Sequence, residues 1–299
     1  MRVFVQALSA AVATEGGLVT NLSELFKLRL TTLVLLTTLA GYHLGRAGAM
    51  DWGLLAWTLV GTGLVAAGAA ALNHGLERGH DARMPRTARR PLPAGRMEPD
   101  AALLIGLVAS AAGILLLGWF VNGLTAALGA LALVSYVAIY TPLKRVTTWN
   151  TLVGAVPGAL PPLMGWTAAR GAAEPAGWLL FAILFLWQVP HFFAIAWLYR
   201  EQYAGAGFRM LPGVDPDGRR TGNQAVFFAA LLLGVAAVPA WLGVVGTLYL
   251  AGSLLLGAGF LAAAVLFRRH LDGPSARRLF FASILYLPAL LSLMAVDKL

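Results

Sequence analysis

The sequence contains no cysteine and little charge. Without cysteine there can be no disulfide, iron–sulfur cluster, thiolate haem ligation or cysteine-based zinc site. Charged residues make up 12% of the 299 residues, whereas a typical soluble domain has about 25%. Acidic residues are the scarcest, 13 against 22 Lys and Arg. What the chain has instead is apolar surface, since 59% of its residues are hydrophobic, and this composition indicates a membrane protein.

Nine apolar stretches follow one another along the chain, and we expect each to form a helix across the bilayer. Most are close to the ~20 residues that span a bilayer core, and in lipid the backbone must satisfy its own hydrogen bonds, which favours helices over an open sheet. The 34 glycines suit close helix packing. The sequence predicts an all-α, polytopic membrane protein, one domain over 1–299, with about nine transmembrane helices in one bundle, at roughly 28–44, 53–73, 101–121, 124–141, 149–168, 176–199, 224–244, 246–267 and 278–296.

The basic residues occupy every second gap between these stretches. All except Arg46, Arg170 and Lys298 lie in the N-terminal arm or in the second, fourth, sixth and eighth connections. Because basic connections stay in the cytoplasm, the pattern predicts a cytoplasmic N-terminus. It also accounts for the net charge of +9 without a nucleic-acid partner.

The first residues faintly resemble a signal peptide, with one arginine and a short apolar run over 2–14. Cleavage there would place Glu24, Lys27 and Arg29 outside the cell, against the charge pattern. We therefore expect residues 1–25 to form an uncleaved cytoplasmic arm.

Two long polar connections, 74–100 and 200–223, are expected to form cytoplasmic active-site loops. Asn73, Glu77 and Asp81 recur every four residues where the first of them begins. Each step of four residues turns a helix by about 400°, so the three side chains stay within about 80° of one face. Oxygen ligands in such a row suit Mg²⁺, which accepts few carboxylates and shares its remaining positions with water and phosphate. The alternative is an ordinary solvated helix end.

Arginines follow this acidic row directly, at positions 83, 86, 89 and 90. Guanidinium groups beside metal-binding carboxylates are what a polyphosphate requires. A topology signal alone would need the basic residues but not the carboxylates. We therefore expect a metal at Asn73, Glu77 and Asp81, and phosphate contacts from Arg83, Arg86, Arg90, Lys144 and Arg145.

Other polar residues are weaker candidates. Lys144 either reaches a phosphate or simply anchors the fourth connection at the membrane face. His191 lies within the sixth stretch, directly after Pro190, and an ionisable residue at membrane depth is a functional candidate. Alternatively, its imidazole bonds a carbonyl that the proline leaves free. His74 and His80 flank the acidic row, and we expect them to be solvated.

These motifs together resemble the UbiA superfamily of intramembrane prenyltransferases and, within it, the protoheme IX farnesyltransferases, or heme O synthases. The resemblance runs from about Phe26 to Gln224. Asn73 to Gly95 is similar to that family's aspartate-rich motif and its M-x-R-T-x-x-R-P-L signature, here Met84, Arg86, Thr87, Arg90, Pro91 and Leu92. Later motifs agree in order: Tyr140 to Arg145 with Thr147 and Asn150, Gly158 to Trp166, Pro190 to Phe192, and Met210 to Pro212.

The chain departs from the family pattern at its acidic positions. The usual D-R-D-I-D reads E-R-G-H-D from Glu77 to Asp81, so Gly79 removes one carboxylate. The usual R-x-D-Y reads Arg200-Glu201-Gln202-Tyr203, so Gln202 replaces an aspartate, and K-P-R near the first stretch reads K-L-R from Lys27. These changes put a second metal position in doubt.

The resemblance implies a UbiA-like fold and a Mg²⁺-dependent transfer of the farnesyl group of farnesyl diphosphate to a vinyl group of heme B. It implies that Asn73, Glu77, Asp81 and Lys144 are catalytic, and that the acceptor or the allylic cation faces Tyr140, Asn150, His191, Phe192, Glu201, Gln202 and Tyr203. It further implies a bacterial inner membrane, with the active site on the cytoplasmic side. Terminal-oxidase assembly proteins are one candidate partner.

Two alternatives remain at this point. One is a prenyltransferase of the same superfamily that acts on an aromatic or chlorin acceptor. The other is a non-catalytic membrane transporter or haem-binding assembly protein, because weakened acidic motifs are what a loss of activity would look like.

Overall fold

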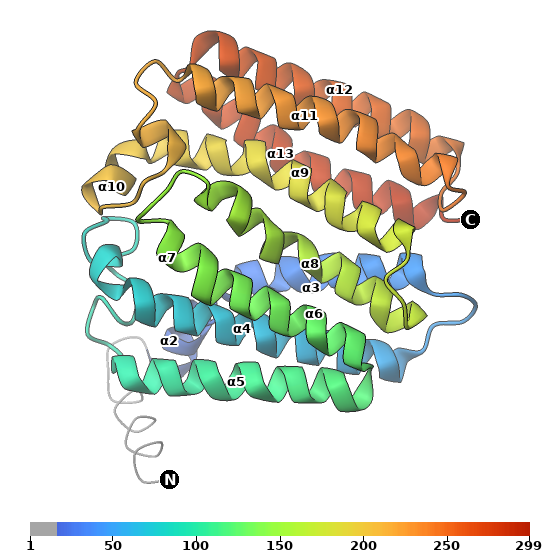
Figure 1. Cartoon of the computed structure of the whole chain (residues 1–299), viewed down its shortest axis with the longest axis horizontal. Coiled ribbons are helices and arrows are strands. Elements are labelled where there is room, and N and C mark those ends of the chain that lie inside the picture. The colour runs from blue at the N-terminus through green and yellow to red at the C-terminus, as the bar shows by residue number, and fades with distance from the viewer. Residues whose placement is uncertain (1–16) are drawn as a thin grey trace.

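A computed structural model describes residues 17–299 of the chain (Figure 1). The predicted cytoplasmic arm therefore lies mostly outside the described residues. Within them the chain is helical apart from one isolated antiparallel bridge between Val245 and Lys298, which confirms the predicted all-α class.

Helices correspond to all nine of the predicted apolar stretches. The helical elements of the first half of the chain are α2 (Gly17–Leu25), α3 (Leu28–Gly45), α4 (Trp52–Asp81), α5 (Pro99–Phe120), α6 (Gly123–Val134), the π-helical η1 (Ser135–Tyr140) and α7 (Thr141–Leu143). In the second half they are α8 (Asn150–Arg170), α9 (Pro175–Leu198), α10 (Arg200–Gly205), the 3₁₀ turn η2 (Leu211–Gly213), α11 (Arg219–Trp241), α12 (Thr247–His270) and α13 (Gly273–Val296).

Among residues 17–299, seven helical segments are long and apolar enough to cross a membrane, or eight if α2 and α3, which meet at a bend of 54°, form one broken span. The remaining predicted stretch is α8, which contains Pro157, Pro161 and Pro162. Despite these prolines, α8 is one continuous helical element over 21 residues.

Glycines bring the helices of the bundle into direct backbone contact. A Cβ added at Gly41 of α3 would lie 1.9 Å from the Pro162 carbonyl oxygen of α8, and one added at Gly165 of α8 would lie 2.0 Å from that of Thr38. Gly68 of α4 and Gly106 of α5 approach each other in the same way. The predicted role of small residues in packing is confirmed. The contact between Gly68 and Gly106 holds α4 close against α5.

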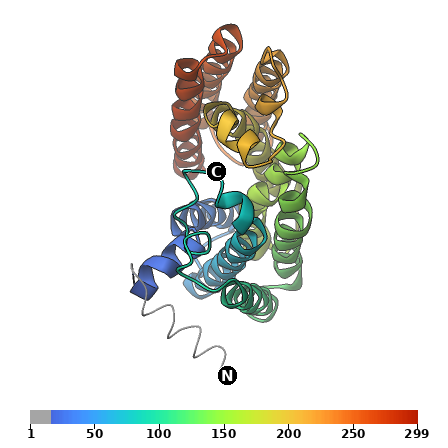
Figure 2. The ribbon, with the colours of Figure 1, turned by 90° about the vertical axis from the view of Figure 1, so that its left-hand side faces the viewer.

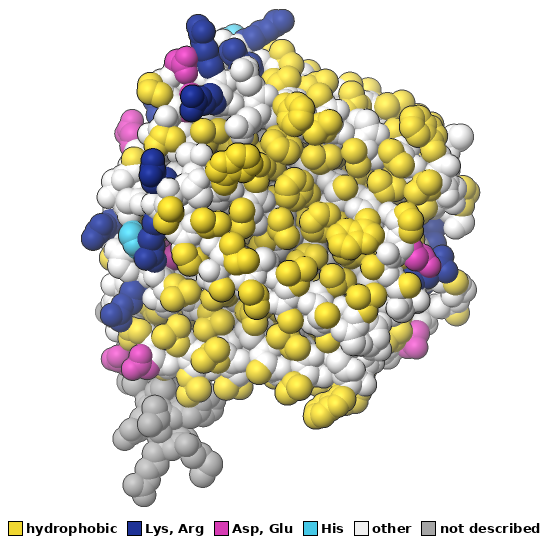
Figure 3. All heavy atoms as spheres, viewed as in Figure 1, with side chains coloured by type: hydrophobic (Ala, Val, Ile, Leu, Met, Phe, Trp, Pro, Cys, Tyr) yellow, Lys and Arg dark blue, Asp and Glu magenta, His cyan; other side chains and the backbone are white. Residues whose placement is uncertain are grey.

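The molecule has two chemically different ends. Apolar side chains cover the middle of the face seen in Figure 3, while Lys and Arg gather at the end that carries α10 and the loop after α4, here called the basic end. Figure 2 views the molecule from that end. At the opposite end, Lys298 Nζ donates to the carbonyl oxygens of His43 and Arg46, both at 2.7 Å. The predicted gathering of charge at one end is thus confirmed, and its orientation in the membrane stays a prediction.

Candidate functional site

The acidic row lies on the last three turns of α4 and is buried. Asn73 is 1% exposed, and Glu77 and Asp81 are each 3% exposed. The alternative of a solvated helix end is therefore wrong. Burial of two carboxylates is costly unless partners compensate for it, so the partners of this row define the site.

Three basic side chains from three different segments meet the row. Lys144 Nζ, just beyond α7, lies 2.9 Å from Oε1 and 3.0 Å from Oε2 of Glu77. Arg90 Nη1, in the loop after α4, lies 2.8 Å from Oδ2 of Asp81. Lys27 Nζ donates to Oδ1 of Asn73 at 2.7 Å. The row thus brings two carboxylates together with three basic side chains, of which Lys144 and Arg90 pair directly with the carboxylates.

Lys144 remains charged in this setting. Burial alone would lower the pKa of its ammonium group, but the charge and hydrogen bond of Glu77, together with the nearby Tyr136 and Tyr203, outweigh burial and raise the pKa above its usual value. Its ammonium also lies 4.5 Å from the ring centre of Tyr140, a cation–π contact. Lys144 therefore places a positive charge directly beside the carboxylate of Glu77.

Lys27 is a site residue that the sequence reasoning missed. It links α2 to α3 with φ 48° and ψ 49°, the left-handed region, which is uncommon for a residue other than glycine. Strained backbone of this kind gathers at functional sites. The signal in the sequence was the K-L-R element, which was interpreted only as a departure from a motif. Its contact with Asn73 spans 46 residues and could not be inferred locally.

Arg86 connects the loop after α4 to the segment that follows α9. Its Nη2 donates to Tyr203 Oη at 3.1 Å, and its guanidinium lies 5.1 Å from the ring centre of Tyr199. Arg83 is exposed, and Arg145 donates to the Leu76 carbonyl oxygen at 2.8 Å. Of the predicted phosphate ligands, Arg90 and Lys144 reach the acidic row directly.

Two predicted acceptor-facing residues have structural partners instead of facing the row. Asn150 is buried and its Nδ2 donates to the Arg209 carbonyl oxygen at 2.9 Å. His191 Nδ1 lies 2.7 Å from Ser283 Oγ, with its ring between Trp187 and Phe280 at 5.1 and 5.2 Å. The partner of His191 is thus a serine hydroxyl of α13, and not the free carbonyl that we had considered.

The remaining candidates differ in exposure. Phe192 is half-buried with its ring centre 5.9 Å from that of His191. Glu201 is exposed, while Gln202 Oε1 is buried without a hydrogen-bond partner among residues 17–299. Tyr203 is the hydroxyl partner of Arg86. These four lie along α9 and α10, next to the site and not within the row.

The expectation that His74 and His80 are solvated is wrong. His74 is 1% exposed, and within the described chain neither ring nitrogen has a hydrogen-bond partner. His80 Nδ1 lies 2.7 Å from the Ala206 carbonyl oxygen, and its ring packs 5.2 Å from that of Phe208. The segment after α10 thus folds back onto the end of α4 at His80, a long-range contact that periodicity does not reveal.

The oxygen atoms of the row are of the type that a hard cation binds, and a metal at these residues stays a prediction. Nowhere between residues 17 and 299 do three His, Asp or Glu side chains gather into a complete metal-binding group. Glu77, Asp81 and the amide oxygen of Asn73 offer a partial set, which suits Mg²⁺ when water and phosphate supply the rest. Gly79 and Gln202 lack the carboxylates that a second ion would need.

Comparison with known proteins agrees with this geometry. A profile of the UbiA prenyltransferase family matches residues 34–285. The chain is 48% identical to the protoheme IX farnesyltransferase of Solibacter usitatus over 284 residues, covering 92% of this chain and 97% of that one.

Solved structures share the fold. A structure of digeranylgeranylglyceryl phosphate synthase superposes with a TM-score of 0.80 at 16% identity, covering 93% of this chain and 98% of that one. A UbiA homologue from Archaeoglobus fulgidus, bound to GPP and Mg²⁺, superposes with a TM-score of 0.65 at 14% identity, covering 92% and 99%. The predicted UbiA-like fold and the resemblance seen in the motifs are confirmed.

Proposed function

Because this chain belongs to the UbiA prenyltransferase family, we propose that it transfers the farnesyl group of farnesyl diphosphate to a vinyl group of heme B, forming heme O and diphosphate. The bond between farnesyl C1 and the diphosphate oxygen breaks, and C1 bonds to the terminal vinyl carbon. Water adds to the other vinyl carbon and releases a proton. The name of the relative that shares nearly half of the sequence supports this acceptor.

The observation that carries the proposal is the set of contacts that the buried acidic row makes with three basic side chains. Lys27 donates a hydrogen bond to Asn73, and Lys144 and Arg90 form ion pairs with Glu77 and Asp81. Mg²⁺ bound at Asn73, Glu77 and Asp81 would neutralise charge on the departing diphosphate. Lys144, Arg90 and Lys27 then bind the outer phosphate oxygens, which gain charge as the carbon–oxygen bond breaks.

Aromatic side chains next to these cations can stabilise the allylic cation. The Tyr140 ring lies beside Lys144, and the rings of Tyr203 and Phe208 lie 6.1 Å apart. Aromatic faces attract positive charge. The apolar helices around them keep out water that would quench the cation early.

The membrane setting follows from the charge pattern. The chain is an integral membrane protein whose named relatives are bacterial. With its basic end in the cytoplasm, the diphosphate site opens on the cytoplasmic side of the inner membrane, between the loops at 74–100 and 200–223. The resemblance to the family also makes terminal-oxidase assembly proteins a candidate partner.

A direct assay separates this function from its two alternatives. Purified protein is given Mg²⁺, farnesyl diphosphate and either heme B or 4-hydroxybenzoate, and prenylated products are sought by mass spectrometry. We expect heme O only. Product from the aromatic acid alone would favour an aromatic acceptor, and no product from either would favour a non-catalytic role.

A further inference from the structure

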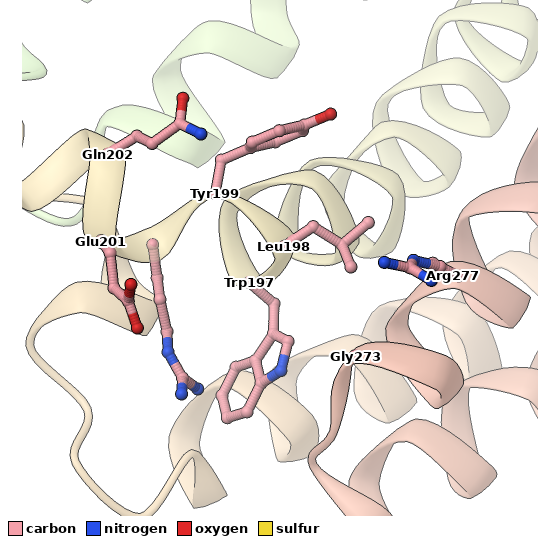
Figure 4. Close-up of a pocket in the computed structure, with 8 residues that line it drawn as sticks. Trp197, Leu198, Tyr199, Glu201, Gln202, Gly273 and Arg277 are labelled. Carbon is pink, nitrogen blue, oxygen red and sulfur yellow. The ribbon is translucent and has the colours of Figure 1, made fainter. Parts of the chain in front are cut away.

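A hollow of about 280 Å³ opens at the basic end, beside the acidic row but separate from it. Its walls are the end of α9, the start of α10 and the first turn of α13 (Figure 4). In that view Tyr199 and Gln202 lie on one side of the α9–α10 junction, and Trp197 and Glu201 on the other. None of the residues proposed to bind the metal or the diphosphate lines this hollow.

The hollow is lined mainly by polar side chains, among them two arginines and the carboxylate of Glu201. Arg200 places its guanidinium 4.8 Å from the ring centre of the buried Trp197, and Arg277 lines the same space from α13. Within residues 17–299 neither arginine forms an ion pair. Two cations against one carboxylate leave the lining with a net positive charge, which favours an anionic ligand such as a dicarboxylate.

A chain of ring and cation contacts joins the hollow to the acidic row. Tyr199 lines the hollow and contacts Arg86, which donates to Tyr203. The Tyr203 ring packs against Phe208, and Phe208 lies 5.8 Å from Lys144 Nζ. These contacts place the hollow on the same side of the molecule as Lys144 and the acidic row.

We propose that this hollow binds the two propionate carboxylates of the heme acceptor, through Arg200 and Arg277. The inference rests on the proposed function. The hollow is at the small end of the ~300–1,000 Å³ of ligand pockets, so it holds one edge of a porphyrin and not the whole ring. Because the vinyl groups lie on the edge opposite the propionates, anchoring the carboxylates directs the vinyl groups inward.

The test uses the full chain in phosphatidylcholine nanodiscs, without farnesyl diphosphate. Zinc protoporphyrin IX and its dimethyl ester are titrated separately, and binding is followed by porphyrin fluorescence. Arg200→Gln and Arg277→Gln should each weaken binding of the diacid about tenfold, a modest loss for one charge-assisted hydrogen bond at an exposed position. The dimethyl ester should bind the wild type weakly, and the variants equally so.

Arg278→Gln is the matched control, because Arg278 is the next residue of α13, is also exposed and does not line the hollow. It should leave diacid affinity unchanged. All three arginines are exposed, so the substitutions should not disturb folding.

The outcomes separate the two proposals. If the wild type binds the diacid but Arg200→Gln and Arg277→Gln bind it equally well, the hollow is not the propionate site, and the proposed function stands. If the wild type binds no porphyrin, both fail. If phosphatidylglycerol in the nanodiscs abolishes the arginine effect, the hollow binds a lipid phosphate, which overturns the assignment.

Discussion

At the scale of single residues, the charges of the acidic row can be tested one at a time. Asp81→Asn keeps the shape of the side chain but removes the charge that Arg90 and the proposed metal share. We expect kcat/KM to fall by about 10²–10³, the loss typical of one preorganised electrostatic contact. The measurement is heme O formation across a Mg²⁺ titration.

The control for this variant is Asp217→Asn, since Asp217 and its partner Arg219 are both exposed, and exposed ion pairs contribute little. It should match the wild type. Near wild-type turnover of Asp81→Asn, with both proteins equally folded by size-exclusion chromatography, would remove Asp81 from the metal site.

The positions of some single site residues could be predicted from the sequence, and those of others could not. Spacing alone placed Asn73, Glu77 and Asp81 on one helical face, and they do share one buried surface. The same reasoning could not foresee that Lys27 leaves the helical region to reach Asn73. Nor could it foresee the partner of His80, because Ala206 lies 126 residues further along the chain.

At the scale of elements, the end of α4 is a place where three other segments deliver positive charge. Lys144 and Arg90 already balance the charges of Glu77 and Asp81, and Lys27 adds a third basic side chain beside Asn73. A divalent cation arriving alone would leave at least two positive charges uncompensated. One arriving with a diphosphate would not, because the phosphate oxygens compensate for it and accept contacts from the displaced Lys144 and Arg90.

We therefore predict that the metal and the diphosphate bind cooperatively. Mn²⁺, followed by electron paramagnetic resonance as a stand-in for Mg²⁺, should bind at least about tenfold more tightly when an unreactive farnesyl thiodiphosphate is present, a coupling of ~1.4 kcal/mol. Lys144→Met should strengthen Mn²⁺ binding without the diphosphate. Equal Mn²⁺ affinity with and without the analogue would contradict the cooperative scheme.

A second prediction at the scale of elements concerns the contact between α3 and α8. Gly165→Ala would place a methyl group against the Thr38 carbonyl oxygen of α3, where the backbone cannot easily yield. We expect a loss of about 1–3 kcal/mol of stability, seen as a lower melting temperature in detergent. Gly259→Ala in α12, where an added Cβ meets nothing within 4 Å, should be neutral or stabilising. Equal melting temperatures for the two variants would refute this account of the contact.

The elements themselves were largely predictable. Apolar runs predicted the approximate bounds of nine helical stretches, because length and hydropathy in lipid leave few other options. Among residues 17–299, seven or eight helical segments are long and apolar enough to cross a membrane, against about nine predicted. The helix α4 continues to Asp81, beyond the span predicted to end at 73, as the four-residue spacing of the acidic row had indicated. The helix α8 stays continuous through its three buried prolines.

At the scale of the whole molecule, the one-sided distribution of charge determines the expected orientation. The cysteine-free sequence makes this simple to measure with single introduced cysteines. Ala172→Cys, exposed at the end opposite the basic one, should react with a membrane-impermeant maleimide in intact cells. Ala204→Cys, exposed in α10, should react only after permeabilisation. The reverse pattern would place the diphosphate site outside the cell.

The link from Lys298 to the carbonyl oxygens of His43 and Arg46 joins residues 255 and 252 positions apart. It can form only after α13 has followed the other helices into the membrane. During synthesis, therefore, the two carbonyl groups at the C-terminal end of α3 lack this partner until almost every later span has been made. In a nascent chain arrested before α13 these two groups would stay without Lys298, and unpaired polar groups are the kind of feature by which membrane quality control recognises an incomplete protein.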